Sequence, residues 1–491
     1  MVIFAPLLGG LLMYAAFAPI SLWWCGPIAM AILVSLLHAP RFSRRLTSVA
    51  IFATAFFAPL LSWSNVYVGN IPWIILTFSQ VVLLLPISLL HLRKDRPELL
   101  LLFPSGWILT EMIRTRFPFG GFGWGRTAFS QADSPYSSLA RLGGVPLLSF
   151  TVATLGVALY LSLSSNLLSW PKGAALFILL FITIATFFVA SSLASEMKSK
   201  NRDFSLVAVQ GGVPQLGLAF NSRATAVFEN HLILTQRYLN HRKSVPDLIL
   251  WPENSVDVDP FRFPLIRKQI QGLVDTYSTP IILGAVLEKG DNFQNASILW
   301  MPKTGPKSTY IKKHLTPFGE YIPLRPIAEF VSPYAKNVRD FLPGREIVVH
   351  HLGRAIFAPL ICFELLDDKI GREMASHSNA TLIQTNSATF GTSSESEQQL
   401  GISRIRAIEH NRFSVSISTS GVSALIDPNG QVSDQTELNR SAVVDGSIGL
   451  VNSLTVSDKY GQHIELALIL FPNALFISIF FLRRGRRMIR K

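Results

Sequence analysis

The sequence has 491 residues, of which 49% are hydrophobic and only 15% are charged, and its formal net charge is +13. Because an ordinary soluble domain has roughly 25% charged residues, this composition excludes a disordered chain, a fibrous repeat and a wholly soluble enzyme. The basic excess would indicate nucleic acid in a soluble protein, but in a membrane protein basic residues orient the spans, so no nucleic-acid partner is expected. The two cysteines exclude a disulfide scaffold and any multi-cysteine metal site.

Long apolar runs fill residues 1–195, and one more lies close to the C-terminus. A hydrocarbon core of roughly 30 Å needs about 20 apolar residues in a helix. We therefore predict a membrane-embedded helical bundle with spans at 2–19, 21–38, 46–63, 71–91, 97–113, 146–165, 174–193 and 464–482. The fifth run also holds Glu98 and Glu111, and the first two could instead be shorter interfacial or re-entrant pieces.

Basic residues indicate the orientation of these spans, because cytoplasmic loops are rich in lysine and arginine. Basic residues follow spans two, four and six, and the tail 483–491 is basic as well. With eight spans, all of these segments fall on one side, so we predict cytoplasmic termini and an outward-facing domain at 201–460. Residues 114–141 break the pattern with four arginines on the outer side. They form either a long connection or a lipid-headgroup or lid element at the interface.

The outward domain has the texture of a layered α/β fold, with short β-branched runs alternating with polar helical stretches. We predict strands at 205–210, 247–251, 281–286, 296–300, 347–351, 355–361, 381–385, 414–418 and 423–426. Helices are predicted at 223–241, 264–276 and 395–410. We find no glycine-rich phosphate loop, no metal-ligand spacing and no G-x-S-x-G motif, so no metal or cofactor is expected.

Three segments place a reactive side chain just after an apolar strand. Glu253 follows 247–251 through Pro252, Lys312 lies in a segment that also carries Glu320, and Cys362 directly follows 355–361. A thiol needs a base to become a nucleophile, and a developing oxyanion needs a fixed cation or hydrogen-bond donor. Glutamate, lysine and cysteine together supply all of these without a histidine.

At these residues the sequence resembles the nitrilase superfamily, whose members use a Glu–Lys–Cys triad. The predicted eight-span frame narrows the resemblance to the apolipoprotein N-acyltransferase family, membrane enzymes of bacterial lipoprotein maturation, and it covers essentially the whole chain. Four motifs carry it: Val209-Gln-Gly-Gly212, Trp251-Pro-Glu-Asn254, Lys312-Lys-His-Leu-Thr-Pro-Phe-Gly-Glu-Tyr-Ile-Pro323 and Ile361-Cys-Phe-Glu364. The resemblance implies an αββα sandwich for the outward domain.

The resemblance also implies a role for each matching residue. Glu253 would be the general base, Cys362 the nucleophile, and Lys312 the oxyanion stabiliser together with the backbone N–H of Phe363. Lys312 is preferred to Lys313 because it stands two residues before His314, as in the family pattern. Glu320 and Glu364 resemble accessory carboxylates that orient the lysine and the thiol.

One segment departs from the family pattern. Many members have an aromatic residue before Phe-Gly, whereas residues 387–391 here read Ser-Ala-Thr-Phe-Gly. We expect this segment to shape a lid or lipid entrance. Two aromatic residues, Trp251 and Phe363, could either belong to the core or line an acyl pocket.

The function implied is acyl transfer from a glycerophospholipid, through a cysteine thioester, to the α-amino group of an S-diacylglyceryl-cysteine at a lipoprotein N-terminus. The expected location is the bacterial cytoplasmic membrane, with membrane lipids around the spans. Two alternatives remain open. A membrane-tethered amidase or nitrilase would use the same triad but pass the acyl group to water. A non-enzymatic transporter or scaffold would not need an intact triad, and transporters typically carry paired charges inside their spans.

Overall fold

The computed structural model describes residues 3–164, 184, 203–214, 225–331 and 339–489. The chain divides into two compact units. Unit 1 comprises Met1–Ser62, Pro72–Met197 and Lys459–Lys491, and unit 2 comprises Trp63–Ile71 and Lys198–Asp458. Unit 2 therefore contains nearly all of the segment predicted to face outward, together with a short piece of the N-terminal half.

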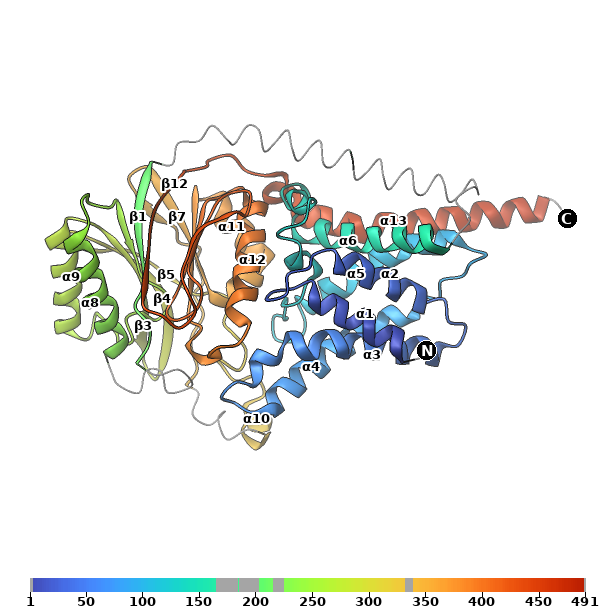
Figure 1. Ribbon diagram of the computed structural model, residues 1–491, viewed down its shortest axis with the longest axis horizontal. Coiled ribbons are helices and arrows are strands. Elements are labelled where there is room, and N and C mark those ends of the chain that lie inside the picture. Colours follow the sequence, from blue (N-terminus) through green and yellow to red (C-terminus); the bar gives the residue numbers. More distant parts are fainter. Residues whose placement is uncertain (1–2, 165–183, 185–202, 215–224, 332–338, 490–491) are drawn as a thin grey trace. The chain divides into compact units, whose positions relative to one another are not determined.

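Apolar helices build unit 1 (Figure 1). They are α1 (Phe4–Ala15), α2 (Cys25–Leu36), α3 (Phe42–Leu60), α4 (Asn70–Leu84), α5 (Leu102–Arg114), α6 (Ala140–Ser164) and α13 (Val456–Ile489). Within the part of the chain that the structure describes, three helical stretches are long and apolar enough to cross a membrane: Asn70–Leu89, Ser137–Leu163 and Val456–Ile479. They overlap the predicted spans 71–91, 146–165 and 464–482, although the second and third begin nine and eight residues earlier than predicted.

The other predicted spans are not among these three stretches. Helices α1 and α2 have 12 residues each, or about 18 Å at 1.5 Å per residue, so the shorter alternative is correct for their helical length. Helix α3 has 19 residues and α5 has 13, the latter preceded by a short 3-10 turn at Pro97–Leu101. The predicted span 174–193 lies outside the described residues apart from Ile184. The total of eight spans remains a prediction.

Two arginines of segment 114–141 are tied to the helices of unit 1. Arg114 is 1% exposed; it donates from Nε to Gln80 Oε1 and from Nη2 to the carbonyl oxygen of Trp124, both at 2.7 Å. Arg116 is half-exposed and forms an ion pair with Glu465 of α13 at 2.5 Å. Both guanidinium groups are therefore used for contacts inside the unit.

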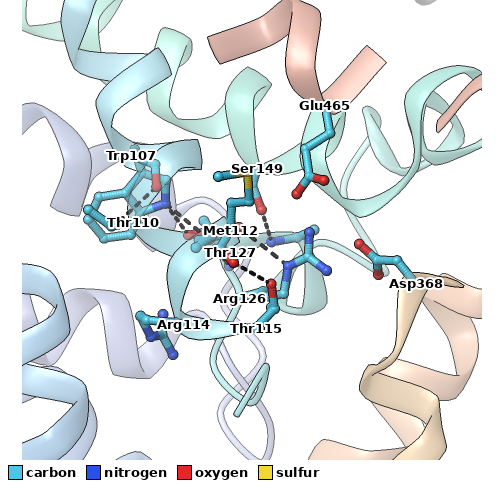
Figure 2. Close-up of polar contacts among 12 residues, drawn as sticks. Trp107, Thr110, Met112, Arg114, Thr115, Arg126, Thr127, Ser149, Asp368 and Glu465 are labelled. Atoms are coloured by element: carbon cyan, nitrogen blue, oxygen red, sulfur yellow. Dashed lines mark hydrogen bonds and ion pairs between the residues drawn. The ribbon is translucent and has the colours of Figure 1, made fainter. Parts of the chain in front are cut away.

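Glu111 organises a second buried contact set, part of which Figure 2 shows. Its Oε1 accepts hydrogen bonds from Trp107 Nε1 at 3.1 Å and from the Thr127 backbone N–H at 2.8 Å. Its Oε2 lies 3.6 Å from Arg126 Nε, and both side chains are 1% exposed. Buried charges are stable only when they are paired and hydrogen-bonded. Because Glu111 belongs to α5 whereas Arg126 and Thr127 follow it in the chain, these contacts hold the segment after α5 against α5.

Unit 2 is a sandwich of two six-stranded sheets. The first has the order β12-β1-β2-β3-β4-β5 and the second β11-β10-β9-β8-β7-β6. The first-sheet strands are β1 (Phe204–Gln210), β2 (Leu248–Leu250), β3 (Ile281–Lys289), β4 (Asn292–Met301), β5 (Gly305–Ile311) and β12 (Ala442–Ile448). The second-sheet strands are β6 (His350–Leu352), β7 (Ala355–Ile361), β8 (Ala380–Thr385), β9 (Ser414–Ser418), β10 (Ala424–Ile426) and β11 (Val432–Gln435). Each sheet has a parallel core, β1-β2-β3 in one and β7-β8-β9 in the other.

Helices cover both outer faces, which gives four layers (Figure 1). Helices α8 (Ala226–His241) and α9 (Pro264–Tyr277) pack on the first sheet through a buried apolar cluster. Helices α11 (Asp368–Ser376) and α12 (Glu395–His410) lie on the second sheet. A second apolar cluster fills the space between the sheets, with side chains from β1, β2, β7, β8 and β9. The expected αββα arrangement is thus present in unit 2.

Most predicted elements of this domain have counterparts in the structure. Strands β7 and β9 and helix α12 match the predicted bounds, whereas β6 is shorter than predicted 347–351 because residues 347–349 are not in a strand. Strands β5, β11 and β12 and helices α10 (Arg325–Val331) and α11 were not predicted. The unpredicted strands are partly exposed, β11 almost wholly, so they lack the apolar run on which the prediction relied.

A close backbone contact in the first sheet leads directly to the reactive segments. Gly284 of β3 lies against the chain that follows β2, since a Cβ at this position would be 2.7 Å from Glu253 Cα and closer still to the Pro252 carbonyl oxygen. Both of these neighbours are backbone atoms. The glycine therefore allows residues 252–254 to lie directly on β3.

We expect Gly284→Ala to destabilise the protein by about 1–3 kcal/mol, the usual cost of overpacking a core. Gly272 in α9 is the matched control, because a Cβ there would meet nothing within 4 Å. Gly272→Ala should be neutral or stabilise the helix by about 0.5–1 kcal/mol. Thermal unfolding of the purified full-length variants measures both, and equal midpoints for the two would contradict the close approach at Gly284.

Candidate active site

Glu253 lies in the buried loop after β2. It is 5% exposed, and its Oε1 accepts a hydrogen bond from Asn295 Nδ2 at 2.7 Å. The loop is fixed by the Val256 backbone N–H and the Ser255 hydroxyl, which both donate to the carbonyl oxygen of Gly284, at 2.9 and 3.0 Å. These hydrogen bonds hold the Glu253 carboxyl group in position inside unit 2, although the residue belongs to neither a strand nor a helix.

Lys312 follows β5 and is 1% exposed. Its Nζ lies 2.8 Å from Glu320 Oε2 and 3.5 Å from Glu253 Oε1. Burial alone would lower the pKa of the Lys312 ammonium, but the two carboxylates outweigh burial and raise this pKa above its ordinary value. Lys312 is therefore a permanent cation between two carboxyl groups.

The two carboxyl groups are not equivalent. Asn295 Nδ2 donates to Glu253 and also to Glu320 Oε1 at 2.8 Å, and the Thr316 backbone N–H donates to Glu320 Oε2 at 2.7 Å. Burial raises the pKa of Glu253, and the Lys312 cation only partly offsets this rise. For Glu320, the closer cation and the hydrogen bonds outweigh burial and lower the pKa. Glu320 is thus the charge partner of the lysine, whereas Glu253 is the carboxyl group suited to take up a proton.

Cys362 stands at the junction of β7 and a 3-10 turn, Cys362–Leu366. Its φ of +50° lies in the left-handed region, which is uncommon for a residue with a side chain. Cys362 as a whole residue is partly exposed, and its sulfur accepts a hydrogen bond from Gln399 Nε2 of α12 at 3.8 Å. Desolvation and the Glu253 carboxylate raise the pKa of the Cys362 thiol, while the Lys312 cation opposes them. The charges of both predicted partners therefore act on this sulfur.

Glu364 ties the lysine and cysteine segments together. It is fully buried, and its Oε1 accepts hydrogen bonds from the Tyr310 hydroxyl at 2.6 Å and from the backbone N–H groups of Lys313 and His314 at 2.8 and 3.2 Å. Its Oε2 accepts from the Ile361 backbone N–H at 2.9 Å. One carboxylate thus contacts the residues that flank Lys312 and the residue before Cys362.

The two aromatic residues left open by the sequence are both buried. Trp251 belongs to the core: it is fully buried, its Nε1 donates to Thr235 Oγ1 at 2.9 Å, and its ring contacts Phe228. Phe363 is 5% exposed, and its ring meets His314 edge-on at 5.2 Å.

Segment 387–391, predicted as a lid or entrance, contacts the short N-terminal piece of unit 2. The Phe390 ring packs edge-on against Trp63 at 5.1 Å, and Gly391, at φ +58°, lies against Tyr67. A Cβ at Gly391 would be 2.9 Å from the Tyr67 hydroxyl oxygen. The lid role itself remains a prediction.

The structure adds residues that sequence reasoning missed. Asn295 links the two carboxyl groups, Gln399 contacts the thiol, and Glu395, 2% exposed, lies one helical turn before Gln399. The signal available for Asn295 was a polar residue directly before an apolar run in a predicted strand. For the α12 residues there was none, since a helix rich in Glu and Gln is ordinarily solvated.

Replacing Glu364 with Gln should destabilise the protein by about 3 kcal/mol or more. A glutamine side chain has an NH2 group in place of one carboxylate oxygen, so the buried N–H or O–H donors at that oxygen would lose their acceptor. Tyr310→Phe, which removes a single donor from the same carboxylate, should cost about 1–2 kcal/mol. Chemical unfolding of the full-length proteins measures both changes. A Glu364→Gln variant as stable as Tyr310→Phe would argue against the linking role of the carboxylate.

Comparison with known proteins covers both units. Residues 9–158 match the family described as apolipoprotein N-acyltransferase N-terminal domain, and residues 207–452 match carbon-nitrogen hydrolase. A protein of Mycolicibacterium smegmatis named apolipoprotein N-acyltransferase is 32% identical over 98% of this chain and 86% of its own length. One of Shewanella oneidensis with the same name is 28% identical over 96% of this chain and 94% of its own. Among solved structures, an amidase from Nesterenkonia sp. covers 51% of this chain and 91% of its own, with 14% identity and a TM-score of 0.39. By these sequence matches, the chain belongs to the apolipoprotein N-acyltransferase family.

Proposed function

We propose that this protein transfers an acyl chain from a glycerophospholipid to the α-amino group of the S-diacylglyceryl-cysteine at a lipoprotein N-terminus. The observation that carries the proposal is the buried Lys312 cation, which lies between Glu253 and Glu320. The charges of Lys312 and Glu253 both act on the Cys362 sulfur. Membership of the family and the apolar helices of unit 1 support lipid-borne substrates.

In the first half-reaction, Glu253 takes the thiol proton while the Cys362 sulfur attacks the carbonyl carbon of the phospholipid ester. Lys312 and the backbone N–H of Phe363 stabilise the oxyanion of the tetrahedral intermediate. The carbon–oxygen bond to glycerol then breaks. Glu253 returns its proton to the departing oxygen, so that a lysophospholipid leaves and a thioester remains on Cys362.

In the second half-reaction, the neutral α-amino group of the acceptor attacks the thioester carbonyl, again with Lys312 facing the oxyanion. The carbon–sulfur bond breaks, Glu253 takes a proton from the attacking nitrogen, and that proton passes to the Cys362 thiolate. An amide is formed and the thiol is restored. Throughout, Glu320 remains ionised and balances the lysine, and Glu364 holds the two segments in position.

For the membrane arrangement, we propose an N-terminal transmembrane domain at 1–195 with about seven spans, the catalytic domain at 201–460, a span at 464–482 and a basic tail at 483–491. The catalytic domain would face away from the cytoplasm and both termini toward it. Basic residues after the second, fourth and sixth predicted spans support this orientation. A site at the outer surface would meet donor and acceptor lipids in the same leaflet.

Intact-mass analysis of the protein incubated with phospholipid should reveal an acyl adduct on Cys362. Hydroxylamine or a diacylglyceryl-cysteine peptide should release it, since both attack a thioester. Cys362→Ala should form no adduct, and Glu253→Ala should form it at least 100-fold more slowly, the usual contribution of a general base.

Two results would overturn parts of this proposal. An adduct that persists in Cys362→Ala would exclude the thioester mechanism. An adduct lost to water as quickly as to the peptide would favour a membrane-tethered amidase.

The orientation is tested with single cysteines in a Cys25→Ala, Cys362→Ala background. Lys268 on α9 and Arg44 on α3 are both exposed, so cysteines at either position should react with a soluble maleimide. On intact spheroplasts, a membrane-impermeant maleimide should label Lys268→Cys at once and Arg44→Cys only after permeabilisation. The reverse order of labelling would place the catalytic domain in the cytosol.

A further inference from the structure

Glu395 is a buried carboxyl group for which the mechanism above has no use. It lies in the first turn of α12 and is 2% exposed. The carboxyl group accepts a hydrogen bond from the hydroxyl of Ser387, while its Oε2 is buried and has no hydrogen-bond partner among the residues that the structure describes. A buried carboxyl oxygen without a donor is costly, so its retention calls for a reason.

The position of Glu395 points to the catalytic residues. Side chains four residues apart share one face of a helix, and Gln399, four residues after Glu395, contacts the Cys362 sulfur. The charge of Glu395 acts on the Cys362 thiol, and the charge of Glu253 acts on Glu395. The carboxyl group thus belongs to the same site, on the side formed by α12.

A purely structural role at the helix N-terminus does not account for the burial. A carboxylate in the first turn stabilises a helix through its dipole, but Glu397, in the same turn, does so from an exposed position. Burying Glu395 adds a desolvation cost that this role does not require.

The acylation of an ammonium group requires two proton acceptors. An α-ammonium group must lose one proton before it can attack and a second as the amide forms. Glu253 takes the second and returns it to the Cys362 thiolate, so the first needs another base near the sulfur.

We propose that Glu395 is this base: it binds the α-ammonium group of the acceptor and takes its first proton. The inference rests on the proposed function. The step is R–NH3⁺ plus the Glu395 carboxylate giving R–NH2 plus the Glu395 carboxylic acid, after which the neutral amine attacks the thioester. After product release, Glu395 keeps this proton at neutral pH and loses it to solvent when the next ammonium group binds.

The ionisation of Glu395 fits this exchange. Burial, together with the charge of Glu253, raises the pKa of Glu395 to about 8, although the hydrogen bond from Ser387 opposes the rise. An α-amino group has a pKa of about 7.7–8.0, so a carboxyl group whose pKa is raised by burial is a stronger acceptor of its proton than an ordinary glutamate. Among the described residues, the groups that interact with Glu395 are Ser387 from the loop after β8, Glu253 from the loop after β2 and Cys362 from the end of β7. An arriving ammonium lowers the pKa of Glu395, so the carboxyl group loses its own proton to solvent as the ion pair forms and can then accept one from the ammonium.

The test separates the two half-reactions with the full-length protein in phospholipid-containing detergent. Intact mass follows the formation of the Cys362 adduct, then its loss to a diacylglyceryl-cysteine peptide. Glu395→Gln should form the adduct within twofold of the wild-type rate but transfer it about tenfold more slowly at pH 7, where only about a tenth of the amine is neutral. The deficit should shrink to threefold or less at pH 9, because the amine is then neutral without help.

Two controls accompany this variant. Glu397→Gln, in the same helical turn but exposed, should behave as wild type in both half-reactions. Hydroxylamine, a nucleophile that is already neutral at pH 7, should release the adduct of Glu395→Gln as fast as that of wild type.

Two outcomes would overturn the inference. One is an equal slowing of adduct formation and transfer in Glu395→Gln, which would show a structural role. The other is a transfer rate to the peptide that is unchanged at pH 7. Failure of the wild-type protein to form any adduct would instead overturn the proposed function, and this result is visible before the acceptor is added.

Discussion

The catalytic unit depends on the neutralisation of one buried cation. Removing an ammonium from water costs several kcal/mol, so Lys312 needs a close and permanent counter-charge. Glu320 supplies it at 2.8 Å and is itself held by Asn295 and the Thr316 amide. Glu253, at 3.5 Å, is left with the higher proton affinity. The different distances of the Lys312 cation from the two carboxyl groups thus keep Glu320 ionised and leave Glu253 as the better proton acceptor.

A second requirement is to align segments from different sheets. Lys312 follows β5, at the edge of the first sheet, and Cys362 follows β7 in the second. The apolar cluster between the sheets holds them together, but non-directional packing does not fix how the ends of two strands are aligned. Glu364 does so, because its two oxygens accept N–H groups from both segments. This explains why a fully buried carboxylate is tolerated where no cation contacts it directly.

The residues of the candidate site that the sequence could single out follow apolar strands or lie in motifs of the family. Glu253 and Cys362 follow runs whose side chains are wholly or largely buried, and their motifs, with that of Lys312, are local in sequence. Asn295, Gln399 and Glu395 could not be found in this way, because their burial arises only when α12 and β4 meet the loops of the site. Strand β11 escaped prediction for the converse reason: it is exposed and polar, and its pairing with β10 alone makes it a strand.

In unit 1, the basic residues that indicate membrane orientation can be chosen correctly only when their burial and pairing are known. The orientation rule applies to basic residues in loops that are free to remain in the cytoplasm. Arg114 and Arg126 are 1% exposed and Arg141 is 4% exposed, whereas Arg116 is paired with Glu465. Buried guanidinium groups that bond to Gln80 or lie beside Glu111 contribute to packing. The same criteria remove Arg45, which is 6% exposed, and Arg93, which pairs with Asp95. Without these six arginines, the predicted orientation rests on Arg41, Arg44, Lys94, Arg96 and Lys172.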